Sequence, residues 1–571
     1  MKSSIDKMAR YWANSVTFDQ STRAEVQKLL DGCNEEELIE RFISPLEFGT
    51  GGMRGIMGAG INRMNRYTVR QATEGLARYI RENPSDSHAG VVIGYDSRHH
   101  SFLFAQSAAE VLAGHGIPVY LFKKLAPTPL ISFEVLRQKA IAGIVITASH
   151  NPPEYNGYKV YWKNGGQIIP PEDQEIIQQV RGVADMGDIS SMDFGQALKE
   201  GKIQWLTEES DAAYLNALDE LALGSLEQNE KAGIIYSPLH GTGVRSVPSM
   251  LQKRGFKKFT LVAEQAEPDG NFPTVTSPNP EDPGVFEKSI ALAGPDDCLI
   301  MANDPDADRL GVMVRHDKEW HRLNGNQVGV LLLDDYLKKL QASGRLPKDG
   351  ALVLTNVTSP LGKKVAQAYG LQVVETLTGF KWIWAAASKM ENEGTGTFVF
   401  GMEESLGYLV GHNVGDKDGV WAAMAFAELT AALQAKGQTP LDQLHVLYQQ
   451  FGYHLDDLET QTLPGVEGKE KIAAMMTEFR QNPPQQIGGK RLQQIIDFQE
   501  NVVITPGSST AKPGPGLPRS NVLTFYLEDD CRVVVRPSGT EPKIKYYFNL
   551  QGANAEEVAE SLQKIKKDLL I

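Results

Sequence analysis

Ser149 is the first residue whose type and setting could support chemistry. It lies in the string ITASHNP (146–152), directly after an apolar run, with His150 beside it and Lys159 ten residues further on. In an open α/β sheet, ligands bind in the crevice beyond the carboxyl ends of strands. A serine there could act as a nucleophile near basic groups. The alternative is an ordinary turn after a strand, because Ser, Asn and Pro form such turns routinely.

Three carboxylates at alternate positions form the second candidate site. Asp304, Asp306 and Asp308 lie between two apolar segments and offer hard oxygen ligands, which suit Mg²⁺ better than a soft metal. An EF-hand begins in the same way, but its sixth position requires Gly and its twelfth requires Glu. Here those positions hold Arg309 and Arg315. Arg309 could orient a phosphate, and a solvated acidic turn is the alternative.

A possible phosphate cradle lies near the C-terminus, in the string RPSGTEPK (536–543). Gly539, with Ser538 and Thr540 on either side, can present backbone N–H groups and hydroxyls to an anion. Arg536 and Lys543 add positive charge to the same segment. A plain β-turn between two strands is the alternative interpretation.

A glycine-flanked acidic loop follows another apolar run, in the string FGMEESLGY (400–408). The adjacent carboxylates of Glu403 and Glu404 could accept hydrogen bonds from sugar hydroxyls. A helix N-terminus uses similar residues, so this segment is weak evidence when taken alone.

The composition excludes several functions. The formal net charge of −14 opposes general binding to nucleic acid or to a membrane surface, so an anionic ligand needs a local basic cluster. Cys33, Cys298 and Cys531 are far apart and give neither a disulfide framework nor a metal-ligand spacing. The N-terminus has no apolar run of signal-peptide length. We therefore expect a cytoplasmic protein.

Short apolar runs alternate with helical patterns from residue 90 onward, and this pattern starts again twice. Such alternation predicts mostly parallel sheets with helices on their faces. Before it we expect a polar, helical segment over roughly 20–42, and after it a Pro/Gly/Ser-rich loop over 504–520 that leads into a smaller α+β domain. The predicted fold class is thus α/β, with three similar domains and a smaller fourth. The predicted domains are 1–205, 206–320, 321–455 and 456–571.

Taken in order along the chain, these strings resemble one known family. TASHNP, DPDADR, GMEES and RPSGTEPK, one in each predicted domain, resemble the motifs of the α-D-phosphohexomutases, which include phosphoglucomutases and phosphomannomutases. The resemblance covers the chain from about residue 45 to its end. The strings GTGGMRGIMG, SPLHGTG, SPNPE and LTGFKW look most like the longer bacterial phosphoglucomutases and the related animal enzymes that also accept pentose phosphates.

The resemblance implies four domains around a central cleft, three of them with mixed sheets. It also implies roles for residues of this sequence. Ser149 would carry the transferred phosphoryl group, and a phosphoserine oxygen would join Asp304, Asp306 and Asp308 as a ligand of Mg²⁺. The remaining matches are His150, Lys159, Arg54 and Arg309 for proton and phosphoryl handling, Thr378, Gly379, Lys381, Glu403 and Ser405 for the sugar, and Arg536, Ser538, Gly539, Thr540 and Lys543 for the other phosphate.

The expected reaction is the interconversion of α-D-glucose 1-phosphate and glucose 6-phosphate, with glucose 1,6-bisphosphate as activating intermediate. The expected partners are small-molecule sugar phosphates, with no nucleic acid and no membrane. A preference for mannose or pentose phosphates, or synthesis of the sugar bisphosphate itself, stays open as an alternative. So do a non-catalytic phosphosugar-binding protein and a metal-dependent phosphatase, although a binding protein gains nothing from a nucleophile beside a metal.

Overall fold

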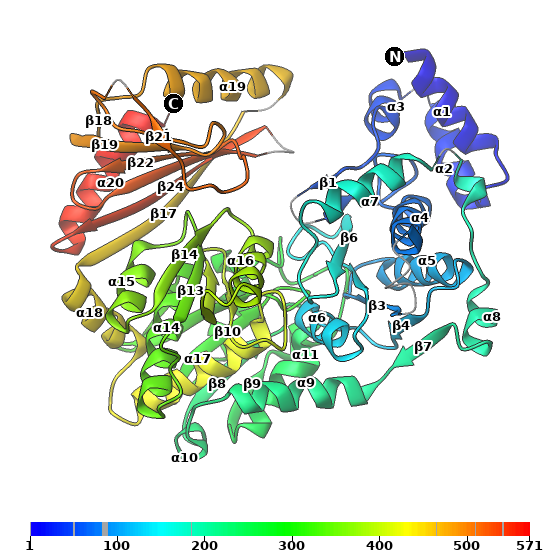
Figure 1. Ribbon diagram of the computed structural model, residues 1–571. Coiled ribbons are helices and arrows are strands. Elements are labelled where there is room, and N and C mark those ends of the chain that lie inside the picture. Colours follow the sequence, from blue (N-terminus) through cyan, green and yellow to red (C-terminus); the bar gives the residue numbers. More distant parts are fainter. Residues whose placement is uncertain are drawn as a thin grey trace. The chain divides into compact units, whose positions relative to one another are not determined.

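The computed structural model (Figure 1) describes residues 2–32, 34–49, 52–82, 89–183, 185–463, 465–508, 510–538 and 542–570. The chain forms two units, and each contains two segments of the sequence. The first comprises Met1–Leu323 and Leu406–Lys436, and the second comprises Asn324–Ser405 and Gly437–Ile571.

None of the described helices has the length and apolar character needed to cross a membrane.

The first unit begins with a seven-stranded mixed sheet in the order β1-β2-β6-β5-β3-β4-β7. Its central strands β3 and β5 are apolar and buried along their whole length, as expected for strands covered on both faces. The strands are β1 (Phe48–Gly49), β2 (Gly52–Ile56), β3 (Val91–Tyr95), β4 (Val119–Phe122), β5 (Ala142–Ile146), β6 (Tyr155–Trp162) and β7 (Ile203–Leu206). The helical segments that follow β1 in this region are α4 (Arg66–Glu82), α5 (Ser101–Gly114), α6 (Thr128–Arg137), α7 (Glu172–Arg181), the 3₁₀ turn η1 (Met186–Asp188) and α8 (Phe194–Lys199).

A second mixed sheet in the same unit has the order β12-β11-β10-β8-β9. Its strands are β8 (Gly233–Ser237), β9 (Lys258–Leu261), β10 (Asp297–Asn303), β11 (Leu310–His316) and β12 (Glu319–Leu323). Its helical segments are α9 (Glu208–Leu221), α10 (Leu226–Asn229), α11 (Gly243–Lys253), α12 (Ala263–Ala266), η2 (Pro283–Phe286), α13 (Glu287–Leu292) and α17 (Gly419–Gln434). Although α17 comes late in the chain, it packs against β10, β11 and α11.

The third sheet, in the second unit, repeats the central strand order of the first two. Strand β13 (Gly350–Thr355) pairs in parallel with β14 (Gln372–Thr376) and with β15 (Thr397–Glu403). In the same way, β3 pairs with β4 and β5, and β8 pairs with β9 and β10. The carboxyl ends of β5, β10 and β15 therefore occupy equivalent places in the three sheets. The other elements are α14 (Gly325–Ala342), α15 (Pro360–Ala368), α16 (Phe380–Asn392), α18 (Pro440–Phe451) and, in the first unit, β16 (Gly407–Leu409).

The C-terminal domain contains an antiparallel sheet in the order β17-β24-β23-β22-β19-β20-β21, with β18 paired to β19. An apolar cluster that contains Val357 and Leu377 of the third domain together with Val534 and Tyr547 joins it to that domain. Its elements are β17 (Tyr453–Thr462), α19 (Gly465–Gln481), β18 (Gln486–Ile487), β19 (Lys490–Asp497), β20 (Val502–Ile504), β21 (Lys512–Pro513), β22 (Leu523–Leu527), β23 (Arg532–Pro537), β24 (Lys543–Gly552) and α20 (Ala555–Leu569). The four-domain α/β architecture expected from the sequence is confirmed.

The helical segment expected over 20–42 is confirmed, and the structure divides it into two helices. The segment forms α2 (Gln20–Asp31) and α3 (Glu35–Phe42), and α1 (Lys2–Asn14) precedes them. Helix α2 ends at Gly32, and the side chain of Asn34 caps α3 by accepting the N–H of Glu37. A buried stack of Trp12 on Phe18 joins these helices to the first sheet's domain through Tyr67.

Candidate active site

Ser149 lies in the turn that connects β5 to β6, and its side chain is buried. Its backbone has a φ of 49°, in the left-handed region that a residue with a side chain seldom adopts. The N–H of Ser149 donates to Oγ1 of Thr147 at 2.8 Å. Its hydroxyl lies 3.2 Å from Nδ1 of His150 and donates to Oδ2 of Asp304 at 2.7 Å. The serine hydroxyl predicted as a nucleophile thus lies between an imidazole and a carboxylate.

Asp304, Asp306 and Asp308 follow β10, at the place in the second sheet that Ser149 occupies in the first. All three are at most 1% exposed, and one oxygen from each lies within 4.8 Å of the others. The positive φ of Ala307, 52°, turns the chain so that the acids on either side of it converge. The alternative of a solvated acidic turn is therefore excluded by burial.

The three carboxylates fit a hard divalent cation. Oδ1 of Asp306 and Oδ1 of Asp308 are buried and accept no hydrogen bond from the described residues. A buried carboxylate oxygen without a partner is costly, and a cation bound to all three acids would remove that cost. Oxygen donors alone suit Mg²⁺ or Ca²⁺ rather than a thiophilic metal.

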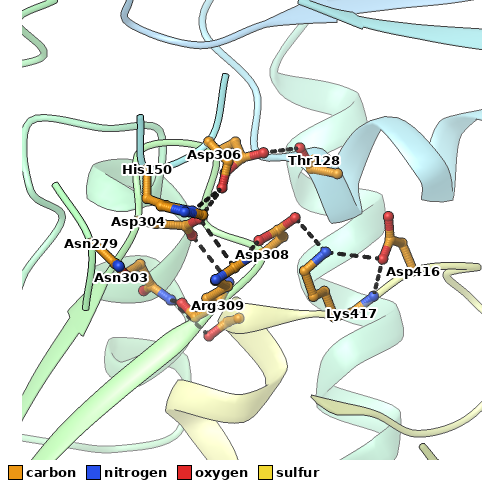
Figure 2. Close-up of polar contacts among 12 residues, drawn as sticks. Thr128, His150, Asn279, Asn303, Asp304, Asp306, Asp308, Arg309, Asp416 and Lys417 are labelled. Carbon is orange, nitrogen blue, oxygen red and sulfur yellow. Dashed lines mark hydrogen bonds and ion pairs between the residues drawn. The ribbon is translucent and has the colours of Figure 1, made fainter. Parts of the chain in front are cut away.

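Cationic side chains lie next to the three acids. Nζ of Lys159 lies 3.0 Å from Oδ2 of Asp306. Nζ of Lys417 lies 2.8 Å from Oδ2 of Asp308, a contact that Figure 2 shows. The backbone N–H of Arg309 donates to Oδ1 of Asp304. On the first sheet, Arg54 of β2 donates from Nη1 to the side chain of Asn151, two residues beyond the serine, at 2.7 Å. The site is thus a basic cluster within an acidic protein.

Burial shifts the proton affinities of these groups. Burial, together with the charges of Asp306 and Asp308, raises the pKa of the Asp304 carboxyl well above its usual range. Burial opposes ionisation of Asp306 as well, but the charges of Lys159 and Lys417 and hydrogen bonding with Asp304 and Lys159 together outweigh it and lower the pKa of that carboxyl. Burial and the nearby charges of Arg309 and Arg54 lower the pKa of His150 well below its usual value. The imidazole beside Ser149 is therefore neutral, and burial and the neighbouring cations disfavour its protonation.

Sequence reasoning missed Lys417 and Thr128. Lys417 precedes α17, and its neighbour Asp416 accepts a hydrogen bond from the hydroxyl of Tyr161 at 2.6 Å. Thr128 opens α6, and its hydroxyl donates to Oδ2 of Asp306 at 3.1 Å, as Figure 2 shows. A run of charged residues, 416–418, directly before an apolar helix was the available signal for Lys417. For Thr128 the sequence holds no comparable signal.

The other predicted site residues belong to the second unit. Glu403 ends β15 and is buried, and Ser405 follows it closely. Gly379, which has a φ of 108°, follows Thr378 and directly precedes α16. Lys381 lies within that helix. The predicted sugar residues thus lie at the carboxyl ends of β14 and β15, as expected for ligand-binding loops.

The predicted phosphate cradle is described in part. Arg536 lies on β23, and the N–H of Ser538 donates to the carbonyl of Lys543, which opens β24. Gly539 and Thr540 lie outside the described residues. Val534 of the same strand packs in one apolar cluster with Leu377, which directly precedes Thr378. The structure therefore brings the base of the cradle close to the predicted sugar loop 377–381.

The site combines a buried serine hydroxyl with three carboxylates and several fixed cations. This arrangement is typical of a phosphoryl-transfer enzyme. The sequence matches, in order, domains I, II, III and the C-terminal domain described as phosphoglucomutase/phosphomannomutase, over residues 45–185, 212–318, 324–451 and 512–567. The chain belongs to this family, which confirms the resemblance drawn from the four motifs.

Individual relatives agree with that assignment. A phosphoglucomutase of Staphylococcus aureus (strain USA300) is 38% identical over 527 residues, which cover 92% of this chain and 93% of the relative. The open form of the Paramecium phosphoglucomutase pp63/parafusin has a TM-score of 0.65 at 17% identity, and the match covers 92% of this chain and 94% of that one. Aspergillus fumigatus N-acetylphosphoglucosamine mutase, solved with GlcNAc-6P and magnesium, has a TM-score of 0.51 at 13% identity over 99% and 98% of the two chains. These two solved structures have the same fold as this chain.

Proposed function

We propose that this protein interconverts α-D-glucose 1-phosphate and glucose 6-phosphate through a phosphoserine at Ser149. The observation that carries the proposal is the hydrogen bond of 2.7 Å between the Ser149 hydroxyl and Asp304, next to the imidazole of His150. The S. aureus relative, 38% identical over most of the chain, is named phosphoglucomutase and supports glucose as the sugar.

The proposed cycle has two transfers. In the first, the C6 hydroxyl of glucose 1-phosphate attacks phosphorus, the bond from phosphorus to Ser149 Oγ breaks, and glucose 1,6-bisphosphate forms. The proton of the C6 hydroxyl passes to a basic group of the site, for which His150 and Lys159 are the candidates, while Ser149 Oγ takes up a proton. After the bisphosphate turns around, Ser149 Oγ gives up its proton and attacks the phosphorus on O1. The bond from phosphorus to O1 breaks, O1 takes up a proton, and glucose 6-phosphate leaves. The net reaction consumes no bisphosphate.

The residues around Ser149 suit this chemistry because phosphoryl transfer depends on alignment and on neutralising the charge of the equatorial oxygens. Asp304, Asp306 and Asp308 would hold Mg²⁺, together with a phosphate oxygen on Ser149. When bound, that ion supplies positive charge at the transferring group. Arg309 and Arg54 would add fixed guanidinium groups. The buried carboxylate oxygens of the triad that accept no hydrogen bond from the described residues, and the magnesium with which the Aspergillus relative was solved, support this choice of metal.

We further propose that the second unit binds the sugar and the phosphate that is not being transferred. Glu403 and Ser405, with Thr378, Gly379 and Lys381, would bind hydroxyls of the sugar. Arg536, Ser538, Gly539, Thr540 and Lys543 would hold the phosphate. The apolar cluster that packs Leu377 with Val534 supports joint action of the two segments.

The domain bounds 1–205, 206–320, 321–455 and 456–571 are also proposed here, and each family match falls inside one of them. The cytoplasm is the proposed location. Cys298 and Cys531 are free thiols, which suits a reducing compartment, while Cys33 lies outside the described residues.

One experiment tests the proposed function directly. Glucose, mannose, glucosamine and ribose 1-phosphates are assayed side by side, each with its catalytic bisphosphate, while intact mass spectrometry follows phosphorylation of the protein. We expect the highest kcat/KM on glucose 1-phosphate and one phosphoryl group, mapped to Ser149. A preference for mannose or ribose 1-phosphate would reassign the substrate, and steady release of inorganic phosphate would indicate a phosphatase.

A further inference from the structure

We infer that Arg98 is a positioning residue that holds the Ser149 turn in the conformation needed for phosphoryl transfer. The inference rests on the proposed function, because it assumes that Ser149 carries the phosphoryl group. Arg98 follows β3, the neighbour of β5 in the first sheet, and its guanidinium is fully buried.

The guanidinium of Arg98 bonds to the backbone of the serine turn at four points. Nη1 donates to the carbonyl oxygens of Pro152 and Tyr155 at 2.8 and 3.0 Å. Nη2 donates to the carbonyl oxygen of Ser149 at 2.6 Å and to that of Asn151. The turn therefore wraps around one planar cation, which can satisfy several carbonyls in a fixed geometry.

Arg98 is itself held from two sides. Its Nε lies 3.3 Å from Oδ2 of Asp96, a buried carboxylate whose Oδ1 accepts the N–H of Arg98 and the hydroxyl of Ser101. On the other side, the ring of Phe272 lies 4.9 Å from the guanidinium carbon. A buried cation with a paired carboxylate and an aromatic face has little freedom to move.

The segment that supplies Phe272 also contacts the serine turn directly. Ser277, the first residue of the SPNPE string, donates its hydroxyl to the carbonyl oxygen of His150 at 2.9 Å. Gly270 in the same segment lies against residues 97–99, where a Cβ atom would come within 2.7 Å of the His99 nitrogen. The segment 269–277 thus packs on the turn and on Arg98 together.

The backbone of Ser149 explains why such a support is needed. A non-glycine residue with a φ of 49° is strained and persists only where its surroundings enforce the conformation. The bonds from Arg98 to the carbonyls of Ser149 and Asn151 lie on either side of His150. They fix the direction of the Ser149 side chain toward Asp304 without touching its hydroxyl.

This arrangement predicts a specific kinetic signature. Arg98 contacts backbone carbonyls, whereas the residues proposed to bind sugar and distal phosphate lie in the second unit. Loosening the turn should therefore slow the transfer step and leave substrate binding unchanged. A displacement of the serine by about 1 Å can cost about 100-fold in rate.

The test is the Arg98→Lys variant of the full chain, because lysine keeps the charge but cannot reach four carbonyls. We expect kcat for glucose 1-phosphate to fall by about 100-fold with KM within about 2-fold of wild type. The rate of Ser149 phosphorylation by glucose 1,6-bisphosphate, followed by intact mass, should fall by the same factor. Arg254→Lys is the matched control: Arg254 is a largely buried arginine of the same unit that bonds to Glu428, Asp219 and the carbonyl of Gly224.

The outcomes separate the inference from the proposed function. If wild type is never phosphorylated on Ser149, the proposed function fails. If wild type is phosphorylated but Arg98→Lys keeps its kcat, or loses it no more than Arg254→Lys does, the positioning role is wrong. Should Arg98→Lys fail to fold, Asp96→Asn, which leaves the guanidinium without its carboxylate, is expected to lower kcat selectively instead. Failure of both variants to fold would overturn the inference, because Arg98 would then be a residue of the structural core.

Discussion

The hydroxyl of Ser149 and the carboxylate of Asp304 meet at 2.7 Å although 155 positions separate them in the chain. Each follows the strand that occupies the same place in its own sheet, β5 in the first and β10 in the second. Two domains of one design therefore each contribute one half of the proposed reaction centre. Neither domain alone contains both the serine and the carboxylates.

Replacing Ser149 with alanine should abolish nearly all mutase turnover while sugar-phosphate binding persists, because the change removes the proposed phosphoryl carrier and no binding group. A coupled assay measures turnover and calorimetry measures binding. Ser246→Ala, a buried serine of α11, controls for loss of a buried hydroxyl. Substantial activity in Ser149→Ala, with contaminating enzyme excluded, would contradict the assignment.

Removing metal should abolish activity, and Mg²⁺ should restore it. The hydroxyl of Thr128 orients Asp306 at 3.1 Å, so Thr128→Val should weaken metal affinity by about 10–100-fold. Metal titration with calorimetric detection provides the measurement. Thr430→Val is the control, since Thr430 bonds only to the backbone carbonyl of Phe426 in the contacts described. Full activity after exhaustive chelation would show that Asp304, Asp306 and Asp308 have only a structural role.

Glu403→Gln should lower kcat/KM on glucose 1-phosphate by about 10–100-fold, the range expected for loss of a charged hydrogen bond to a sugar hydroxyl. Its thermal stability should change little. Glu391→Gln removes a carboxylate from α16 beside the same sheet, where Glu391 accepts the N–H of Phe398, and should keep its kinetics. Unchanged kinetics in Glu403→Gln would remove Glu403 from the sugar site.

Arg536→Ala should raise KM for glucose 1-phosphate by about 10-fold or more, because a charge-assisted bond to the phosphate is lost. Metal affinity should stay at the wild-type value. Arg491→Ala serves as the control, since Arg491 is an exposed arginine of the same sheet that pairs with Glu528. Bound sugar phosphate should also protect backbone amides after residue 504 from hydrogen exchange. If saturating ligand leaves this exchange unaltered and Arg536→Ala binds glucose 1-phosphate normally, the phosphate is held elsewhere.

The stability of the C-terminal sheet should fall between pH 7 and pH 5 because of His454. Burial on β17 lowers the pKa of this imidazole to about 4, and Nδ1 bonds to the carbonyl of Gly452. The unfolded chain binds a proton near pH 6.5 that the folded chain rejects, so the free energy of unfolding decreases as pH falls. This contribution is roughly 2 kcal/mol between pH 7 and 5. Chemical denaturation of His454→Gln should lack it, and an equal pH slope in both proteins would contradict the prediction.

The fold class and the places of the four candidate loops could be predicted from the sequence, because each loop combines an apolar strand with an abrupt polar turn. Strands β5, β10 and β15 were visible in this way, as the apolar runs that lead into Ser149, Asp304 and Glu403. Arg98 and Thr128 were not, because their importance comes from contacts made only after distant segments meet. The pairing of Thr128 with Asp306, for example, spans 178 positions. The boundary between α2 and α3 was missed because two short caps, rather than a change of periodicity, create it.

Helix α17 has a consequence for synthesis on the ribosome. It covers β10 and β11, and Lys417, the residue before its N-cap, pairs with Asp308. Residues 324–405, which belong to the other unit, are nevertheless synthesised after β11 and before α17. The first unit can therefore close only after Lys436 has left the exit tunnel, a delay on the order of ten seconds after Leu323 emerges. A nascent chain that stops before α17 presents an uncovered apolar sheet face to chaperones and carries an acidic triad without its lysine partner.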